Sequence, residues 1–306
     1  MNLAKTLLIL LLLQGFFSTP YVFADNAKAH QKPLAIGTGL PQFKTFIEKV
    51  GGHRVLVVNL LAKGDSAHSY TPSPKTLTQV MRSDIYFSSG LVFEERIISK
   101  LSSSHSGPLF VNLSKKLPLI EADDCGCSTH LVSTPHTHNK TSHNLTMDLH
   151  TWLNPVNVMT ICINIKETLS KTDPKNKRLY SENCLRYIKK LKETDNSIQE
   201  IFKPYRNKPF YVYHPSLGYF AKRYNIKQVA IEIAGREPSG RQLTTLIRQT
   251  KKNGVHTIFV QKGFPLSAAK RLAMTIDGKV EFIDPLATDY SNNLLSIANL
   301  VSNSMK

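Results

Sequence analysis

The chain has 306 residues, of which 41% are hydrophobic, and carries 39 Lys and Arg against 22 Asp and Glu, which gives a formal net charge of +17. This length suits one large or two medium domains, and the apolar fraction is ordinary for a globular protein. A basic surface is compatible with nucleic-acid binding, but the scattered basic residues and the export signal argue against it and favour attraction to anionic lipid or polymer.

Residues 1–24 have the pattern of a secretory signal peptide. They contain one charge, Lys5, followed by the apolar run LLILLLLQGFF, and they end in Val22-Phe23-Ala24, which predicts cleavage after Ala24. The apolar run is too short for a membrane span, and no later run approaches the required length. No Cys lies near the cleavage site, so no lipid anchor is expected. We therefore expect a soluble mature protein in an exported compartment, most simply the periplasm.

From Lys32 onward, short apolar runs alternate with segments of helical periodicity, which is typical of an α/β fold with parallel sheets. Gly51-Gly52 is predicted to end the first helix, and Asn154-Pro155 has the pattern of an N-cap followed by a first-turn proline. In this first part of the chain we predict strands at 33–36, 54–61, 84–88 and 109–113, and helices at 40–50, 75–82 and 90–101.

Residues 175–203 form the longest helical pattern, with apolar residues three, four or seven apart and no Gly or Pro before Pro204. At 1.5 Å per residue such a helix is about 40 Å long, enough to bridge two lobes. After it, the alternation restarts with strands at 209–213, 228–233, 257–261 and 280–283. We therefore predict an α/β fold of two lobes, each with a mainly parallel sheet flanked by helices: an N-terminal lobe at 25–174, a linking helix at 175–203 and a C-terminal lobe at 204–306.

A His-rich loop at 125–149 interrupts the first lobe. It is rich in Ser, Thr and Asn and poor in large apolar side chains, so burial cannot offset its ordering entropy and a mobile loop is predicted. Neutral imidazole is a common zinc ligand, and several on one flexible segment can converge on one ion. The alternative is a solvated polar loop. The predicted secondary metal ligands are His130, His136, His138 and His143.

Four further residues with metal-ligand chemistry stand after predicted strands or close the His-rich loop. Ligands of open α/β sheets bind outside the carboxyl ends of the strands, which makes these positions candidates for one site. Taken singly, each would be an ordinary loop histidine or turn aspartate. Asp148 is a candidate acceptor that would orient an imidazole two residues later. The four candidates are His68, His150, His214 and Asp284.

The four cysteines permit two disulfides in an oxidising compartment. Cys125 and Cys127 are too close for an unstrained mutual bridge and are better suited as soft metal ligands. Cys162 and Cys184 lie on successive predicted helices, which antiparallel packing would bring together. Two small buried thiols are the alternative, but we predict a disulfide in the exported protein.

The motifs around these residues resemble those of the metal-binding solute-binding proteins of bacterial ABC importers, the group that serves zinc, manganese and iron. The resemblance covers essentially the whole mature chain. It implies two α/β lobes joined by a rigid helix, with His68, His150, His214 and Asp284 as ligands in the cleft between them. The motifs are GDSAHSYTPSP, SDIYFSSGLVFEE, DLHTWLNP, YHPSLGYFAKRYN, REPSGRQL and IDPLATDY.

The resemblance also implies which metal is carried. Members that serve zinc are similar to this chain in having histidine as the third ligand and a His-rich loop before the second, whereas manganese members tend to have a carboxylate third. The predicted cargo is therefore Zn²⁺, with Mn²⁺ or Fe²⁺ as the alternative. Two residues depart from the family pattern: Asn154 stands where aspartate is frequent, and Gln261 where glutamate is common.

We therefore predict a monomeric, non-enzymatic substrate-binding component that captures Zn²⁺ and delivers it to a membrane permease with a cytoplasmic ATPase. Nucleic acid is not an expected partner. The alternative is an exported zinc-dependent hydrolase, because three histidines and an open coordination position also describe catalytic zinc. Such an enzyme needs a positioned general base, and the sequence has no HExxH or comparable arrangement, although Asp284 could fill that role.

Overall fold

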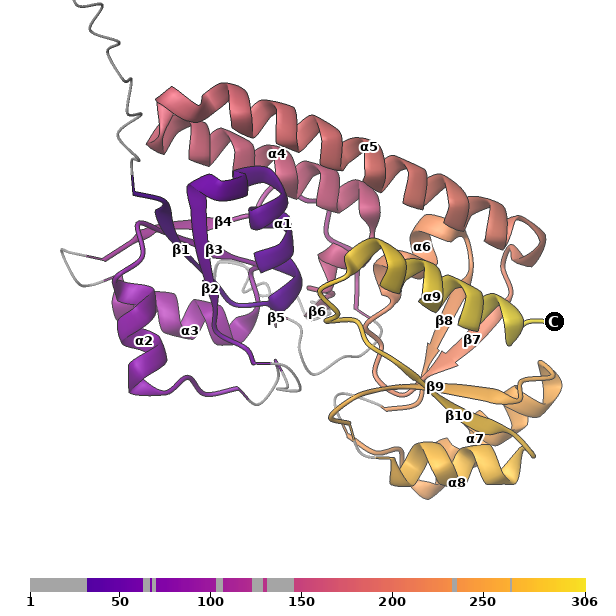
Figure 1. Ribbon diagram of the computed structural model, residues 1–306. Coiled ribbons are helices and arrows are strands. Elements are labelled where there is room, and N and C mark those ends of the chain that lie inside the picture. The colour runs from indigo at the N-terminus through magenta and orange to yellow at the C-terminus, as the bar shows by residue number, and fades with distance from the viewer. Residues whose placement is uncertain are drawn as a thin grey trace, which may run out of the picture. The chain divides into compact units, whose positions relative to one another are not determined.

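The computed structural model describes residues 32–62, 67, 70–102, 107–122, 129–130, 146–232, 236–264 and 266–306. They contain two four-stranded sheets in which every strand pair is parallel (Figure 1). The first sheet has the order β2-β1-β3-β4, with β1 (Leu34–Thr38), β2 (Val55–Asn59), β3 (Ile85–Ser88) and β4 (Leu109–Asn112). The second has the order β10-β9-β7-β8, with β7 (Pro209–Val212), β8 (Lys227–Ala230), β9 (Thr257–Gln261) and β10 (Lys279–Ile283). The prediction of two parallel-sheet lobes is confirmed.

The helices begin and end within a few residues of the predicted positions, because local signals define them. Asn154 Oδ1 accepts a hydrogen bond from Val156 N at 2.9 Å, as an N-cap does. Gly52 has φ +57°, a conformation that glycine adopts without steric cost, and it ends the first helix. The helices are α1 (Pro41–Gly51), α2 (Pro74–Met81), α3 (Val92–Leu101), α4 (Pro155–Thr172), α5 (Lys177–Phe202), α6 (Gly218–Tyr224), α7 (Gly240–Lys252), α8 (Ser267–Thr275) and α9 (Tyr290–Asn303).

The long helix α5 runs beside α4 and contacts α1 in the first lobe and α6 and α9 in the second (Figure 1). Towards its N-terminal half, Tyr187 lies near Phe46 of α1, with ring centroids 6.4 Å apart. At its C-terminal end, Phe202 lies 5.7 Å from Phe220 of α6. The predicted linking helix is therefore present between the lobes, while the exact lobe boundaries at 174 and 203 stay predictions.

One buried hydrophobic cluster extends from the first sheet through α4 and α5 to one face of the second sheet, and a second cluster covers the other face. Strand β7 divides its side chains between them. Phe210 and Val212 belong to the first cluster, whereas Tyr211 and the following Tyr213 belong to the second. This alternation follows from the two-residue period of a strand. The two lobes consequently share a continuous core.

The first turn of α9 bridges the C-terminal sheet and the N-terminal lobe. The Tyr290 ring stands edge-on to Phe46 of α1 at 5.0 Å, and its hydroxyl donates to the Trp152 carbonyl at 2.6 Å. Thr45 Oγ1 donates to the carbonyl of Thr288 at 3.0 Å. The sequence assigned this helix to the C-terminal lobe, and its packing against α1 and α5 was not predicted.

The predicted disulfide between Cys162 and Cys184 is wrong for this structure, in which both residues are free thiols. They lie on the packed helices α4 and α5 and are 0% and 2% exposed, so each fills the core as a small apolar side chain would. Burial raises the pKa of both thiols, and for Cys162 the neighbouring Cys184 raises it further. The structure thus has the alternative arrangement of two buried thiols.

Several predicted features lie outside the described residues: the signal peptide at 1–24, Cys125, Cys127, His136, His138 and His143. In the His-rich loop, Thr129–His130 pairs with Thr146–Met147 as the short antiparallel strands β5 and β6, a feature the sequence did not predict. None of the helices in the described part is long and apolar enough to cross a membrane.

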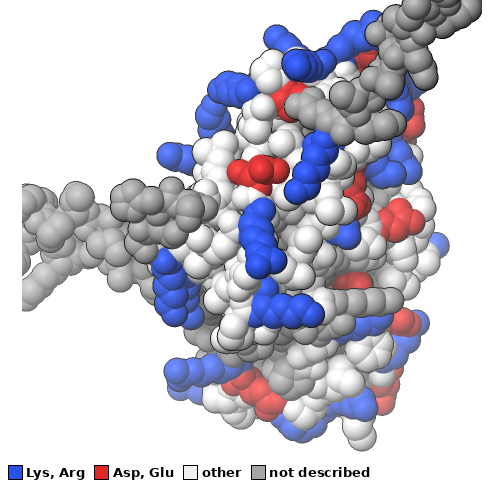
Figure 2. Space-filling view, turned by 60° about the vertical axis from the view of Figure 1, so that its left-hand side comes forward, with Lys and Arg blue, Asp and Glu red and all other residues white. Residues whose placement is uncertain are grey.

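The surface charge is distributed as the sequence suggested. On the face shown in Figure 2, Lys and Arg side chains are spread widely, with Asp and Glu between them. A spread of this kind favours general attraction to anionic surfaces over recognition of a polyanion along one groove.

A buried carboxylate, that of Glu94 on α3, is hydrogen-bonded to β3 and to the residues that follow it. It accepts hydrogen bonds from Ser89 N at 2.8 Å, from the Ser89 hydroxyl, from Leu91 N and from the Tyr86 hydroxyl. A Cβ at Gly39 would overlap Glu94 Oε1, so only glycine fits there. Burial raises the pKa of Glu94 to about 7, although the hydrogen bonds from Ser89, Leu91 and Tyr86 lower it.

Glu94 should make the free energy of unfolding fall as pH rises from 4.5 to about 7. In this window the native protein keeps the proton and the unfolded chain releases it, so the native state binds more protons and loses stability with rising pH. The full effect is about 3 kcal/mol. Urea unfolding of metal-free protein at several pH values should show that Glu94→Gln removes this slope, while Glu95→Gln at the adjacent exposed position retains it. Parallel pH profiles for the parent and Glu94→Gln would contradict the assignment.

Candidate functional site

His150 lies at the start of a short 3-10 turn (Thr151–Leu153) and is oriented by Asp148. Asp148 Oδ1 lies 2.7 Å from His150 Nδ1 and also accepts from the His150 backbone N at 2.8 Å. Both side chains are buried. Because a carboxylate accepts at Nδ1, the hydrogen-bond network assigns the proton to Nδ1 and places the lone pair on Nε2, the atom that would bind a metal. The predicted contact between Asp148 and the His150 ring is confirmed.

His214 follows β7 and is held in the same way by Glu232. The parallel register pairs Val212 with Ala230, so the residues two positions further on, His214 and Glu232, lie side by side. Their Nδ1 and Oε1 atoms are 2.6 Å apart. Burial lowers the pKa of His214, although the hydrogen bond to the Glu232 carboxylate opposes this, and the lower pKa favours the neutral ring that a metal ligand requires.

Two further side chains fix the backbone and ring plane of His214. Gln261 Nε2 donates to the His214 carbonyl at 2.9 Å, which gives a positioning role to a residue that departs from the family pattern. Phe264 stacks on the imidazole at 4.6 Å with the planes 20° apart. Neither contact was predicted, and neither was Glu232. For Glu232 the available signal was an acidic residue inside the otherwise apolar run VAIEI.

The two imidazoles meet at their Nε2 atoms, which are 3.4 Å apart. With both Nδ1 atoms donating to carboxylates, the two Nε2 atoms face each other as two acceptors rather than as a donor and an acceptor. Zinc binds histidine nitrogen at about 2.0–2.1 Å in a tetrahedral arrangement, which places two ligand nitrogens about 3.4 Å apart. The separation therefore fits a pair of nitrogen ligands to one tetrahedral ion.

The other two predicted ligands are Asp284 and His68. Asp284 directly follows β10 and is half-buried, and its Oδ1 accepts from Leu286 N at 3.0 Å. His68 lies outside the described residues. Among the residues that the structure describes, no three His, Cys, Asp or Glu side chains form a group that could hold a metal. Of the four candidates, the structure therefore brings together His150 and His214.

The segment that carries Asp284 is nevertheless attached to the segment that carries His150. The indole Nε1 of Trp152 donates to the carbonyl of Pro285 at 3.0 Å, and the Trp152 ring lies 5.3 Å from the His150 ring. Asn293 Nδ2 on α9 donates to the carbonyl of Asp284 at 2.7 Å. These contacts position the backbone of Asp284 at the same interlobe region.

Asp148 is itself held by the start of α6. Tyr219 donates its hydroxyl to the Asp148 carbonyl at 3.1 Å. A Cβ added at Gly218 would lie 2.5 Å from Asp148 Oδ2, so the absence of a side chain there lets the carboxylate reach its position. Gly218 belongs to the motif YHPSLGYFAKRYN, but no separate signal in the sequence indicated this role.

Comparison with known proteins identifies similar chains along nearly this whole length. The family model described as "Zinc-uptake complex component A periplasmic" matches residues 36–303. The high-affinity zinc uptake system protein ZnuA of Bacillus subtilis strain 168 is 31% identical over 232 residues, which are 74% of this chain and 70% of that protein. The zinc-binding protein AdcA of Streptococcus pyogenes serotype M3 is 28% identical over 291 residues, 92% of this chain. The chain spans 56% of AdcA, about half its length.

Solved structures show the same fold. A crystal structure of ZnuA covers 90% of this chain, and 100% of the solved chain is matched, with a TM-score of 0.80 and 28% identity. A ZnuA deletion mutant with zinc bound covers 90% of this chain and 99% of its own, with a TM-score of 0.79 and 28% identity.

Gly218→Ala should weaken Zn²⁺ binding by about 10- to 100-fold, because the new Cβ displaces the carboxylate that orients His150. Gly240→Ala is the matched control: Gly240 also begins a helix, and a Cβ there meets no atom within 4 Å. Competition with a zinc chelator measures both affinities, and thermal melting confirms that both variants fold. Unchanged zinc affinity in folded Gly218→Ala protein would show that Asp148 does not depend on this space.

Proposed function

The chain belongs to the family of periplasmic zinc-uptake complex component A proteins, and on that premise we propose that it is the substrate-binding component of an ABC importer that captures Zn²⁺ between its two lobes and delivers it to a membrane permease. The observation that carries this proposal is the 3.4 Å separation of the Nε2 atoms of His150 and His214, each ring held at Nδ1 by a buried carboxylate. That separation fits two ligands of one tetrahedral zinc ion.

The proposed ligand set is His68, His150, His214 and Asp284. His150 and His214 supply two nitrogens whose positions are fixed before metal binds. Asp284 stands at the end of β10, and Asn293 anchors its main chain, so its carboxylate is the proposed oxygen donor. His68 would complete a set of three nitrogens and one oxygen.

This donor set favours zinc over manganese. Manganese prefers oxygen donors and more of them, whereas zinc accepts four ligands of mixed nitrogen and oxygen. The Irving–Williams order also ranks manganese and iron below zinc. Mn²⁺ and Fe²⁺ are the alternative cargo.

Electrostatics support a dication at this position. Asp148 and Glu232 are both buried, at 3% and 4% exposure, and each contacts an imidazole that is itself buried. A nearby cation stabilises buried carboxylates, so a divalent ion bound at the Nε2 atoms would be favourable here. The carboxylates also increase the basicity of the rings and thereby strengthen coordination.

The remaining parts of the proposal concern location, partners and catalysis. We place the mature protein in the periplasm as a monomer, released by cleavage after Ala24 without a lipid anchor, and we name a permease with its cytoplasmic ATPase as partner. One relative, from Streptococcus pneumoniae, is called a zinc-binding lipoprotein, so a lipid-anchored form is the alternative. Absence of catalysis is an expectation, which a hydrolytic assay on zinc-loaded protein tests.

His214→Glu should weaken Zn²⁺ relative to Mn²⁺, because it replaces a nitrogen donor with a hard oxygen donor. His214→Ala should weaken both metals, zinc by at least about a hundredfold, which corresponds to about 2.8 kcal/mol. The measurement is competitive loading with zinc, manganese and iron at controlled free concentrations, read by native mass spectrometry. His256→Glu, at an exposed position of the same lobe, is the control and should change neither affinity. A native protein that prefers manganese at equal free concentration would overturn the assignment of zinc.

The loop histidines His130, His136, His138 and His143 should form a weaker, separate collecting site. They must lose chain entropy to converge, whereas the interlobe ligands are preorganised. Removing residues 129–144 should therefore leave one tight zinc site, as should replacing the four histidines with Asn at constant loop length. Zinc titration with a fluorescent competitor measures the number of tight sites. Loss of tight binding in both variants would refute the separation.

A further inference from the structure

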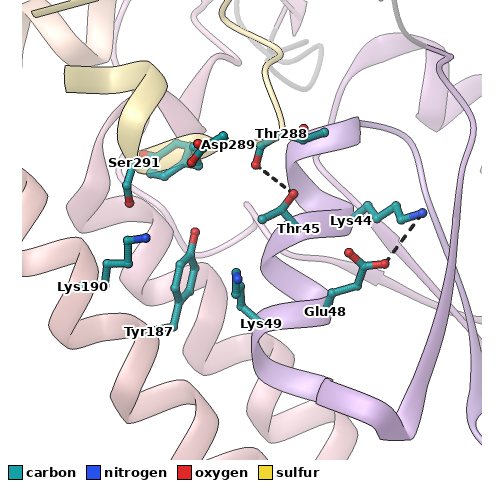
Figure 3. A pocket seen from close by; sticks show the side chains of 10 residues that line it. Lys44, Thr45, Glu48, Lys49, Tyr187, Lys190, Thr288, Asp289 and Ser291 are labelled. Atoms are coloured by element: carbon teal, nitrogen blue, oxygen red, sulfur yellow. Dashed lines mark hydrogen bonds and ion pairs between the residues drawn. The ribbon is translucent and has the colours of Figure 1, made fainter. Parts of the chain in front are cut away.

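A pocket of about 570 Å³ lies where α1, α5 and the first turn of α9 meet (Figure 3). None of the predicted metal ligands that the structure describes lines it. It brings together side chains from three helices that are far apart in the sequence, and the function proposed above leaves it without a role. The residues on which the argument depends are Lys44, Lys49, Tyr187, Lys190, Asp289 and Ser291.

Two of the three lysines that line the pocket are available to a ligand. Lys44 forms an ion pair with Glu48 at 3.7 Å. For Lys49 of α1 and Lys190 of α5, no ion pair with another described residue is present. Two ammonium groups on either side of one cavity, without carboxylate partners in the described part of the chain, are a favourable environment for an anion.

Two hydroxyl groups that line the same pocket also lack a hydrogen-bond partner within the described ranges, and that of Ser291 is buried. Ser291 is 4% exposed, and its Oγ has no hydrogen-bond partner among the described residues. Figure 3 shows this side chain directed towards Lys190 and Tyr187. Tyr187 is 6% exposed, and its hydroxyl makes no hydrogen bond to another described residue. The buried Ser291 hydroxyl costs free energy while it stays unpaired, so a bound acceptor would stabilise it, and the Tyr187 hydroxyl offers a second donor that faces the pocket.

The backbone adds donors at the same place. Ser291 is the second residue of α9, a helix of 14 residues. Tyr290 N donates to the Thr288 carbonyl and Asn293 N donates to the Asp289 carbonyl, which leaves the two intervening N–H groups without a partner in the helix. The positive end of the helix dipole therefore points at the pocket.

The carboxylates of the pocket do not reverse this preference for an anion. Glu48 is paired with Lys44, and Asp289 accepts from Asn292 Nδ2 at 2.8 Å on the exposed side of the helix start. Burial raises the pKa of Tyr187, with Cys162 and Asp289 contributing in the same direction, so its hydroxyl stays protonated and can donate. The pocket thus presents a buried hydroxyl donor and, at its exposed rim, two ammonium groups.

We propose that this pocket binds a small oxyanion, a phosphate or a carboxylate, through the ammonium groups of Lys49 and Lys190 and the hydroxyls of Tyr187 and Ser291. The volume of about 570 Å³ exceeds that of inorganic phosphate and accommodates an organic anion of the size of citrate. This site does not depend on the zinc-binding function, because none of its groups is a proposed metal ligand.

The test is isothermal titration of the metal-free chain with inorganic phosphate and, separately, with citrate, at ionic strength held constant with sodium chloride. At least one anion should bind with a Kd of about 1 mM or tighter. Binding of phosphate alone identifies a phosphoryl ligand, and binding of citrate alone identifies a carboxylate ligand. No binding of either anion overturns the proposal.

Two variants and one control assign the binding to this pocket. Lys190→Glu should weaken the bound anion at least about tenfold, because it reverses a charge in direct contact. Lys192→Glu makes the same charge reversal two residues further along α5, at an exposed position that does not line the pocket. It should change the anion affinity by less than about twofold at constant salt. Equal losses in the two variants would reduce the effect to general surface attraction and overturn the proposal.

Ser291→Ala gives an independent readout. It removes a buried hydroxyl that has no partner among the described residues, so the melting temperature without anion should stay the same or rise. The increase in melting temperature on adding the anion should become smaller. A lower melting temperature without anion, together with an unchanged shift on adding it, would show that the hydroxyl serves the fold and not a ligand.

Discussion

Two buried imidazole–carboxylate pairs must be held at a fixed separation, and the rest of the fold provides the contacts that hold them. His150 and His214 present Nε2 atoms to each other at 3.4 Å because Asp148 and Glu232 hold their Nδ1 atoms. Two imidazole nitrogens this close, each on a ring held by a buried carboxylate, are suited to sharing one cation. Binding of such an ion to the folded state would add to its stability, which couples the proposed function to folding free energy.

The two lobes hold their imidazole–carboxylate pairs through different contacts. In the second sheet, strand register alone places Glu232 beside His214, and Gln261 and Phe264 fix the ring from the next strand and its loop. In the first lobe, the short pairing of β6 ends at Met147, before His150. The His150 ring is positioned by Asp148, and Asp148 can lie close to the start of α6 because Gly218 has no side chain. The proposed metal centre therefore draws on both lobes, which share a continuous core through α4 and α5.

The first turn of α9 serves two regions of the molecule. Asn293 holds the main chain of Asp284 near the proposed zinc site, while Ser291, two residues earlier, lines the pocket that we assign to an oxyanion. Tyr290 between them contacts Phe46 and Trp152 in the N-terminal lobe. A ligand in the pocket would consequently restrain the same turn that positions Asp284, since one short segment makes both sets of contacts.

Much of the fold follows from the sequence because it is determined locally. The spacing of apolar residues predicts the helices and strands to within a few residues, helped by Gly52 and Asn154-Pro155 at helix ends. His214 and His150 can also be selected from the sequence, because one follows a predicted strand and the other closes the His-rich loop. Only the tertiary structure decided the rest: Glu232 beside His214, Gly218 against Asp148, free thiols at Cys162 and Cys184, and α9 against α1. Each of these depends on which elements become neighbours in space, and neighbours are chosen by the packing of whole side-chain surfaces across long sequence separations, which no local period or motif encodes.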